Sequence, residues 1–452
     1  MEMKGMLAPA PAAAAVVGLL VLSGLAGGLP GAAAATVRHA PTAGQAVPGR
    51  SAPPRTASSR TASSRTANGR VFGGWVLPNP GISSILRGVA CTSSRNCWAV
   101  GSYENSTAEL NEALHWDGSR WLRVAIPYPG TGHQSSLAAV PCISARNCWA
   151  VGSFDRGTTP LNEALHWDGT RWSKIATPQP GMPGNVANSL NGVSCVSFRD
   201  CWAVGSHTTQ GGIGENAALW WNGARWSVVH VPEPGQKVVG DGRELSGVSC
   251  TTFNSCLAVG GYVGADSAEL NDALRWNGFS WLRTTTANPG TGHHSKLTAV
   301  TCTSSSNCWA VGSYDHGAGQ FNEALYWDGT SWSRVATPDP GTSGSSVHIL
   351  NGVSCGSRFS CWAVGSHITD GIGHNVVLGW NGVSWSAVHV PQPGQKTAGD
   401  DGDTRELNGV SCTGHTHCVA VGGYISSAKT ERNEALRWNG LQWLRSSLAT
   451  AH

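Results

Sequence analysis

The chain has 452 residues, with 30 Lys and Arg against 27 Asp and Glu, and its formal net charge at pH 7 is only +3. This mild balance gives no indication of a nucleic-acid partner. The 59 glycines and 23 prolines interrupt the sequence throughout, which argues against long helices and a helical solenoid.

Residues 1–35 have the composition of a secretory signal peptide. Lys4 supplies the positive start, residues 12–29 form an apolar run, and Ala33 and Ala35 fit an A-x-A cleavage site. A single membrane anchor is the alternative, but the run is short, rich in Ala and Gly, and followed by a proline. The sequence therefore predicts a secreted, extracellular protein with no stable membrane insertion once the signal peptide is removed.

Residues 36–70 predict a disordered linker rich in Arg, Ser, Thr and Ala. The segment contains six arginines, no acidic residue and the imperfect repeat RTASS-RTASS-RTANG. It has too little apolar surface to offset its chain entropy on folding. Its charge could hold it near an anionic wall polymer or membrane surface, but a solvated spacer is the favoured interpretation.

Residues 71–452 contain a block of about fifty residues that is repeated seven times. The copies begin at Leu86, Leu137, Leu190, Leu245, Leu297, Leu350 and Leu407. Each copy has four runs of strand length bounded by Ser, Asn, Asp, Gly or Pro. In the fifth copy these runs cover 297–302, 308–314, 322–327 and 332–337. A repeat of this length, built of short alternating runs, is typical of a radial β architecture.

An Asp-Gly or Asn-Gly pair separates the third and fourth runs of every copy, which is a strong hairpin signal. The pairs begin at Asp117, Asp168, Asn222, Asn277, Asp328, Asn381 and Asn439. One Trp precedes each pair and another follows three residues after the Gly, and these two positions hold 14 of the 21 tryptophans. Because these indoles recur in every copy, we expect them to pack between neighbouring units rather than to stack on sugars.

All 14 cysteines fall into Cys-x5-Cys pairs, one in each copy. The pairs are Cys91 and Cys97, Cys142 and Cys148, Cys195 and Cys201, Cys250 and Cys256, Cys302 and Cys308, Cys355 and Cys361, and Cys412 and Cys418. In a chain with a signal peptide, this pattern predicts a disulfide within each copy. Zinc is the competing interpretation, but no His or acid recurs in all seven copies to complete a site, so no metal is predicted.

Four strands in each of seven copies predict an all-β fold, a seven-bladed β-propeller with four antiparallel strands and one disulfide in each blade. A second level of repetition lies above the blades. Copy two resembles copy five, copy three resembles copy six, and copies one, four and seven form a third class. This pattern indicates growth by duplication of a three-copy unit.

The run CLAVGGYVGADSAELNDALRWNGFSWLRTTTANPG at 256–290 resembles a kelch repeat. It has a strand ending in Gly260-Gly261, a variable loop, a strand with an aromatic residue, a short turn, and then Trp281 and a Pro. The resemblance covers 86–452 with a loose motif, and it implies the kelch and galactose-oxidase-like propeller fold without any catalytic residue or cofactor. The form with paired cysteines is similar to secreted repeat proteins of actinobacteria. Residues 71–81 resemble the end of a repeat, and their place in the ring stays open.

Successive strands alternate in direction, so the cysteine loops and the Gly turns are expected on one face. The longer, variable loops after the second and fourth strands are expected on the opposite face, where binding residues commonly lie. The most individual loops belong to copies three and six. Their candidate ligand-binding residues are Lys237, Asp241, Arg243, Glu244, Lys396, Asp400, Asp401, Asp403, Arg405 and Glu406. The aspartates at 400–403 match no calcium-ligand spacing.

Two classes of function are compatible with this sequence. The first, which we favour, is a non-catalytic binding or scaffold module, monomeric and without cofactor, for an extracellular glycan, wall polymer or protein. The second is a secreted hydrolase, lyase or oxidase acting on carbohydrate with the variable face. The clearest recurring acids are Glu112, Glu163, Asp272, Glu323 and Glu434. Their periodicity indicates a structural role, because a catalytic residue is normally unique.

Overall fold

The computed structural model describes residues 82–128, 134–157, 159–181, 186–235, 242–264, 267–289, 294–317, 319–339, 347–369, 371–393, 405–426 and 429–446. The chain divides into two units, Met1–Arg70 and Val71–His452, and every described residue belongs to the second. All regular elements in these residues are β-strands. Within the described part, no helix is long and apolar enough to cross a membrane.

Each repeat forms four antiparallel strands that pair in chain order. The first has β1 (Ser83–Ser93), β2 (Asn96–Glu104), β3 (Glu109–Trp116) and β4 (Trp121–Arg123). The second has β5 (Ser135–Ala139), β6 (Cys142–Ser144), β7 (Asn147–Arg156), β8 (Thr159–Trp167) and β9 (Trp172–Ile175). The third has β10 (Asn188–Ser197), β11 (Asp200–Thr208), β12 (Gly214–Trp221) and β13 (Trp226–Val228).

The fourth repeat has β14 (Arg243–Thr252), β15 (Ser255–Val263), β16 (Glu269–Trp276) and β17 (Trp281–Arg283). The fifth has β18 (Ser295–Ser304), β19 (Asn307–His316), β20 (Gly319–Trp327) and β21 (Trp332–Arg334). The sixth has β22 (Val347–Ser357), β23 (Ser360–Thr369), β24 (Ile372–Trp380) and β25 (Trp385–Ala387). The seventh has β26 (Arg405–Cys412), β27 (Cys418–Ile425), β28 (Glu431–Trp438) and β29 (Trp443–Arg445).

Several strand ends differ from the predicted runs; in the fifth repeat β18 begins at Ser295 and β20 at Gly319, both earlier than predicted. In the same repeat the fourth strand ends at Arg334 instead of near Thr337, although the N–H of Val335 still donates to the carbonyl of Ala324 at 2.9 Å. In the second repeat, Pro141 divides the first strand into β5 and β6. A proline cannot donate to the strand ladder, so the pairing stops there and resumes at Cys142.

The predicted disulfides are confirmed. Seven bonds join cysteines six residues apart, and no described cysteine is free. In each first hairpin the two cysteines lie directly opposite each other, as Cys91 and Cys97 do. The indole of Trp116 then donates from Nε1 to the carbonyl of Ser94, at 3.1 Å, and the equivalent bond recurs in the other six repeats. The cysteine loop and the Gly turn therefore lie on one face, as predicted.

The apolar cores lie between neighbouring repeats. In the core between the second and third repeats, Trp149 packs against Trp221 and Trp226 with ring centroids 4.8 and 5.2 Å apart. The predicted packing of the paired tryptophans is thus confirmed, and the third indole was not anticipated. It comes from the Cys-Trp-Ala-Val-Gly run, and Leu257 and Val419 replace it in the fourth and seventh repeats.

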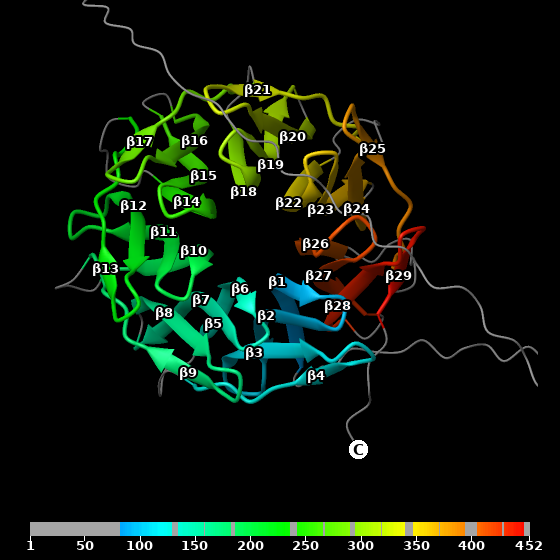
Figure 1. Cartoon of the computed structure of the whole chain (residues 1–452), viewed down its shortest axis with the longest axis horizontal. Helices are drawn as coiled ribbons and strands as arrows, with labels where there is room; N and C mark the ends of the chain where they lie inside the picture. The colour runs from blue at the N-terminus through cyan, green and yellow to red at the C-terminus, as the bar shows by residue number, and fades with distance from the viewer. Residues whose placement is uncertain are drawn as a thin grey trace, which may run out of the picture. The chain divides into compact units, whose positions relative to one another are not determined.

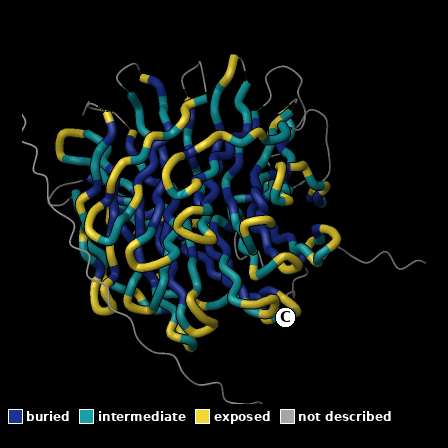
Figure 2. Tube along the Cα trace, turned by 45° about the horizontal axis from the view of Figure 1, so that its top comes forward, coloured by how far each residue is buried: buried dark blue, intermediate teal, exposed yellow. Residues whose placement is uncertain are grey.

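The first and last repeats pack on each other in the same way (Figure 1). The backbone N–H of Cys91 donates to Oγ of Ser411 at 3.0 Å, and Nδ2 of Asn408 donates to the carbonyl of Leu86 at 3.1 Å. Figure 1 shows the first strand of each repeat innermost and the short fourth strand outermost. Buried residues lie along the strands, chiefly the second and third of each repeat, and exposed residues lie at the turns (Figure 2).

A narrow central hollow of about 220 Å³ is lined by three consecutive residues from the first strand of every repeat. These residues follow a register shift such as that between Leu86 and Gly88. The neighbouring inner strands approach very closely here. A Cβ atom added to Gly192 would lie 2.9 Å from the Cα atom of Gly247, so a larger residue at this position would force the strands apart.

Candidate functional site

The face opposite the cysteine loops carries the loop between the second and third strands of each repeat, and it also carries the connections between repeats. We call it the loop face. Each connection contains two prolines, or an Ala and a Pro, around one variable residue. In five repeats this residue folds back and accepts a hydrogen bond from the backbone N–H of the equivalent Asn on the third strand. The acceptors are Gln179, Glu233, Asn288, Asp339 and Gln392.

The first repeat departs from this pattern because Tyr128 occupies the variable position. The N–H of Asn111 donates instead to Oγ of Ser135, at 3.2 Å. The Tyr128 side chain is 45 % exposed and leaves a hollow of about 710 Å³ beneath the connection. This site was not predicted from the sequence. Tyr128 could have indicated it, because the other connections have Gln, Glu, Asn or Asp at the equivalent position.

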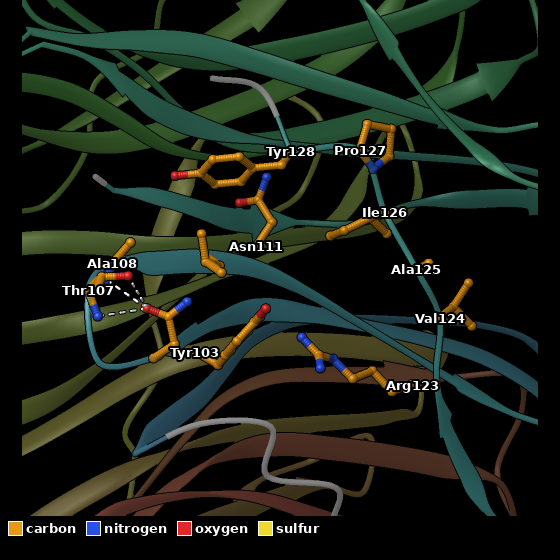
Figure 3. Close-up of a pocket in the computed structure, with 12 residues that line it drawn as sticks. Tyr103, Thr107, Ala108, Asn111, Arg123, Val124, Ala125, Ile126, Pro127 and Tyr128 are labelled. Carbon is orange, nitrogen blue, oxygen red and sulfur yellow. Dashed lines mark hydrogen bonds between the residues drawn. The ribbon is translucent and has the colours of Figure 1, made fainter. Parts of the chain in front are cut away.

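Aromatic and hydrogen-bonding groups line the hollow together. Figure 3 shows Asn111 between the rings of Tyr128 and Tyr103, with Arg123 extending toward Tyr103. The guanidinium carbon of Arg123 lies 4.2 Å from the centroid of that ring, an arrangement that fixes both side chains. Ile126 adds an apolar wall on the side of Tyr128.

Hydrogen bonds hold the loop that borders this hollow, and burial keeps the hydroxyl of Tyr128 protonated. Asn105 accepts hydrogen bonds of 2.8 Å from the N–H groups of Thr107 and Ala108, which holds the loop between β2 and β3. Burial raises the pKa of Tyr128, and the nearby Glu163 and Tyr103 raise it further. The Tyr128 hydroxyl is therefore protonated at neutral pH and able to donate as well as accept.

The described residues lining this hollow include no Asp, Glu, His or Cys. Hydrolysis of a glycosidic bond usually uses two carboxyl groups, whereas the titratable side chains that line this hollow are Tyr103, Tyr128 and Arg123. The side chains that are present suit the binding of a neutral or anionic polyhydroxylated ligand, through the tyrosine rings and the Arg123 guanidinium group.

The recurring acids lie elsewhere, buried between repeats. Nδ2 of Asn111 donates to Oε2 of Glu163 at 2.8 Å, and Nδ2 of Asn271 donates to Oε1 of Glu323 at 3.0 Å. The same bond joins Asn216 to Asp272, Asn375 to Glu434 and Asn433 to Glu112. Burial raises the pKa of Glu163 to about 7 and that of Glu323 to about 8. These carboxyl groups connect neighbouring repeats.

The five repeats that contain a buried acid also carry a Lys or Arg on the fourth strand and a Tyr or Phe on the second strand. In the fourth repeat, for example, Nε of Arg283 lies 3.3 Å from Oδ1 of the buried Asp272, and the guanidinium carbon of Arg283 lies 5.2 Å from the centroid of the Tyr262 ring. The third and sixth repeats lack the acid and the cation, and they have His207 and His367 at the position that holds Tyr or Phe in the other five. Acid, cation and aromatic ring therefore occur as a set.

The structure describes four of the ten residues that the sequence singled out on the loop face. Arg243 is 1 % exposed and donates to the carbonyls of Pro234 and Gly214, at 2.9 and 3.0 Å. Arg405 is similarly buried, donating to the carbonyls of Pro393 and Gly373. Both guanidinium groups tie a connection to the sheet beside it.

The two described glutamates of this set lie nearer the surface. Glu244 forms an ion pair with Lys296 and, with Arg243, lines a second hollow of about 440 Å³. Glu406 accepts a hydrogen bond from Nδ2 of Asn408 at 3.2 Å. The other six candidates lie outside the described residues: Lys237, Asp241, Lys396, Asp400, Asp401 and Asp403. No group of three or more His, Cys, Asp or Glu in the described ranges is arranged to hold a metal ion.

No protein-family model matches this sequence, and no curated protein matches it. Solved structures do resemble the fold. A GH74 xyloglucanase from Xanthomonas campestris aligns with a TM-score of 0.52 and 13 % identity, over 83 % of this chain and 56 % of the xyloglucanase. This chain thus spans little more than half the length of that enzyme. A PL25 ulvan lyase aligns with a TM-score of 0.51 and 8 % identity, over 83 % of this chain and 97 % of the lyase.

A six-bladed fucose-binding lectin from Aleuria aurantia aligns less well, with a TM-score of 0.35 and 11 % identity, over 82 % of this chain and 97 % of the lectin. At such identities a likeness concerns the fold alone. The class that the strands and their arrangement define is the β-propeller, here an all-β protein of four-stranded antiparallel sheets with a disulfide in each repeat.

Proposed function

We propose that this chain is a secreted, seven-bladed β-propeller of kelch-like type that binds an extracellular glycan or wall polymer without catalysis. The blade count is supported by the contribution of each of seven first strands to the central hollow and by the packing of the last repeat on the first. Seven disulfides support an oxidising compartment. The kelch relationship rests on the Gly-Gly and Trp pattern of the fourth and seventh repeats.

The observation that carries the binding function is the hollow beneath Tyr128. It places two tyrosine rings, the Arg123 guanidinium group and the Asn111 amide around a space of about 710 Å³. A few polar groups fixed among apolar and aromatic walls are typical of ligand sites. The lack of an acidic residue among its described lining residues favours binding over hydrolysis.

Two further residue sets remain part of the proposal. The loops of the third and sixth repeats, including Lys237, Asp241, Lys396, Asp400, Asp401 and Asp403, share the loop face and are proposed to widen the contact with a long polymer. Arg243, Glu244, Arg405 and Glu406 would act there by holding those loops in place. A carbohydrate-active enzyme is the alternative function, and the xyloglucanase and the lyase provide its fold analogy.

A binding screen with a matched variant tests this proposal. Full-length secreted protein is titrated with a panel of soluble neutral and uronic-acid polysaccharides. Tyr128→Gln introduces the residue that the second and sixth repeats use to close this position, as Gln179 does. We expect this variant to fold normally and to lose binding, while Tyr128→Phe, which keeps the ring, retains most of it.

The alternatives give different results in the same screen. If Tyr128→Gln binds as the wild type does, but exchange of 236–241 and 395–403 for the short PGTGH connection of the first repeat abolishes binding, the site is on those loops. This exchange keeps the buried Arg243 and Arg405 that start β14 and β26. Shortening of a polysaccharide during incubation, measured by size-exclusion chromatography, would establish an enzyme instead.

A further inference from the structure

The face opposite the loop face is built of disulfide-linked and hydrogen-bonded turns, and we call it the hairpin face. It consists of the tips of the seven cysteine loops and of the seven Gly turns. In each repeat the disulfide closes one hairpin and a tryptophan indole bonds the tip of that hairpin, as Trp276 does to the carbonyl of Phe253 at 3.1 Å. The two tips touch, since a Cβ atom on Gly278 would lie 2.8 Å from Cβ of Asn254.

Large apolar side chains stand exposed at the tips of four repeats. Their exposed fractions are 59 % for Phe198, 72 % for Phe253, 92 % for Phe279, 55 % for Phe359, 83 % for Val383 and 88 % for Leu441. They belong to the third, fourth, sixth and seventh repeats, whereas the Gly turns of the first, second and fifth repeats carry Ser or Thr. The turns hold these side chains in solvent, where they are available for contact with a partner surface.

The charge of each Gly turn varies with the residue at its tip, which is the residue after the Gly. Where Ser119 follows Asp117-Gly118, its hydroxyl donates to the Asp117 carboxylate at 2.6 Å. Where Phe279 follows Asn277-Gly278, its backbone N–H donates to a neutral amide oxygen, at 2.9 Å. All four turns with an apolar tip start with Asn, and all three with a hydroxyl tip start with Asp. Negative charge is therefore absent from the turns that expose apolar side chains.

The net charge of the hairpin face is positive. The cysteine loops and the four-residue Gly turns contain seven arginines, four aspartates and no other Lys, Arg, Asp or Glu, whereas residues 71–452 as a whole contain 23 basic and 26 acidic residues. Two of the arginines lie directly beside exposed rings, Arg199 at 5.0 Å from the Phe198 centroid and Arg358 at 4.3 Å from the Phe359 centroid. The hairpin face thus combines cationic groups with separate apolar tips.

We propose that the hairpin face docks on an anionic lipid bilayer, with the apolar tips of the third, fourth, sixth and seventh repeats entering the interfacial region. Amphipathic membrane-surface contacts combine basic side chains, which approach anionic headgroups, with apolar side chains buried at the acyl boundary. Separate projecting tips suit a deformable lipid surface better than a protein partner, which would need one pocket for each tip. Docking in this way leaves the loop face, with the Tyr128 hollow, directed toward solution.

Vesicle sedimentation with the full-length secreted protein tests this proposal. The vesicles are phosphatidylcholine alone, or phosphatidylcholine with about a third phosphatidylglycerol, as an anionic surface. We expect binding to the anionic vesicles and about tenfold or greater loss of partitioning in Phe279→Ser/Leu441→Ser, since two apolar side chains no longer enter the interface. The matched control is Val228→Ser/Leu282→Ser, which alters two outer-strand side chains exposed by 50 % and 47 %. It should bind as the wild type does.

The comparison of wild type with Phe279→Ser/Leu441→Ser also separates the hairpin face from the basic segment 36–70, because both proteins keep that segment. Equal binding by wild type and Phe279→Ser/Leu441→Ser would assign the attraction to that segment and overturn the proposal. Failure to bind either vesicle would also overturn it, and a dimer that the double variant dissociates would then identify a second copy of the chain as the partner. Near-UV circular dichroism establishes that each variant is folded.

Discussion

Asn433 donates a hydrogen bond of 2.8 Å from Nδ2 to Oε2 of Glu112, a residue 321 positions earlier in the chain. The bond is one of five equivalent amide–carboxyl contacts between neighbouring repeats, and it is the one that joins the last repeat to the first. Both groups are buried, with exposed fractions of 2 % for Asn433 and 0 % for Glu112. A local motif, Asn-Glu-Ala-Leu, therefore makes a contact that spans almost the whole repeat region.

This contact predicts a measurable coupling between the first and last repeats. Asn433→Ala leaves the buried Glu112 carboxyl without its donor and should lower the free energy of unfolding by about 1–3 kcal/mol. In a double-mutant cycle, Asn433→Ala combined with Glu112→Leu should cost less than the sum of the single changes. Guanidinium unfolding measures both, and simple additivity would show that the contact contributes nothing.

Stability should fall as the pH rises because of the buried acids. Burial raises the pKa of Glu323 from 4.5 to about 8 in the folded protein, so the folded state binds its proton more tightly than the unfolded state. This contribution to stability is complete below pH 4.5 and is lost as the pH rises through about 8. Glu323→Gln, which still accepts from Asn271, should show a smaller fall in melting temperature between about pH 5 and pH 9 than the wild type.

The control for that experiment is Asp328→Asn, at an exposed turn that four other repeats already build with Asn. Its melting temperature should keep the pH dependence of the wild type. An unchanged slope in Glu323→Gln would mean that Glu323 is ionised in the folded protein.

A stack of three histidines should produce the opposite dependence at acidic pH. The ring of His367 lies 5.6 Å from that of His348 and 4.8 Å from that of His374, on three paired strands of the sixth repeat. Burial and these two neighbours lower the pKa of His367 from 6.5 to about 4. Its contribution is present above pH 6.5 and is lost as the pH falls toward 4. His367→Tyr, which introduces the residue that the fifth repeat has at this position as Tyr314, should remove part of this acid sensitivity in thermal melts.

Each disulfide is expected to add a modest amount to the stability of the folded protein. Each closes a loop with only five residues between the cysteines, for which the entropic contribution is about 2 kcal/mol. Cys91→Ala/Cys97→Ala should therefore remain folded with a lower denaturation midpoint. Peptide mapping of the wild type should find only bonds within repeats, and a bond between repeats would contradict the assigned pairs.

The sequence was sufficient for the strands, the hairpins and the cysteine pairs, because these depend on short patterns such as Asn-Gly and Cys-x5-Cys. It was insufficient for the contacts between repeats. The donation from Asn111 to Glu163 and the third indole at Trp149 arise only when two repeats meet, and no local pattern encodes that geometry. The Tyr128 hollow was missed because it depends on which side chain accepts from the N–H of the third-strand Asn, Ser135 in the first repeat and the variable residue of the connection in five others.

The pairing of cysteines six residues apart also bears on how such a chain can lengthen. A copied repeat brings both halves of its own cross-link, so duplication never creates an odd thiol or a choice between partners. Its third strand likewise brings both an amide for the following neighbour and, in most copies, a carboxyl for the preceding one. A block of three such repeats carries three complete cysteine pairs, so duplication of the three-copy unit leaves every cysteine with its partner.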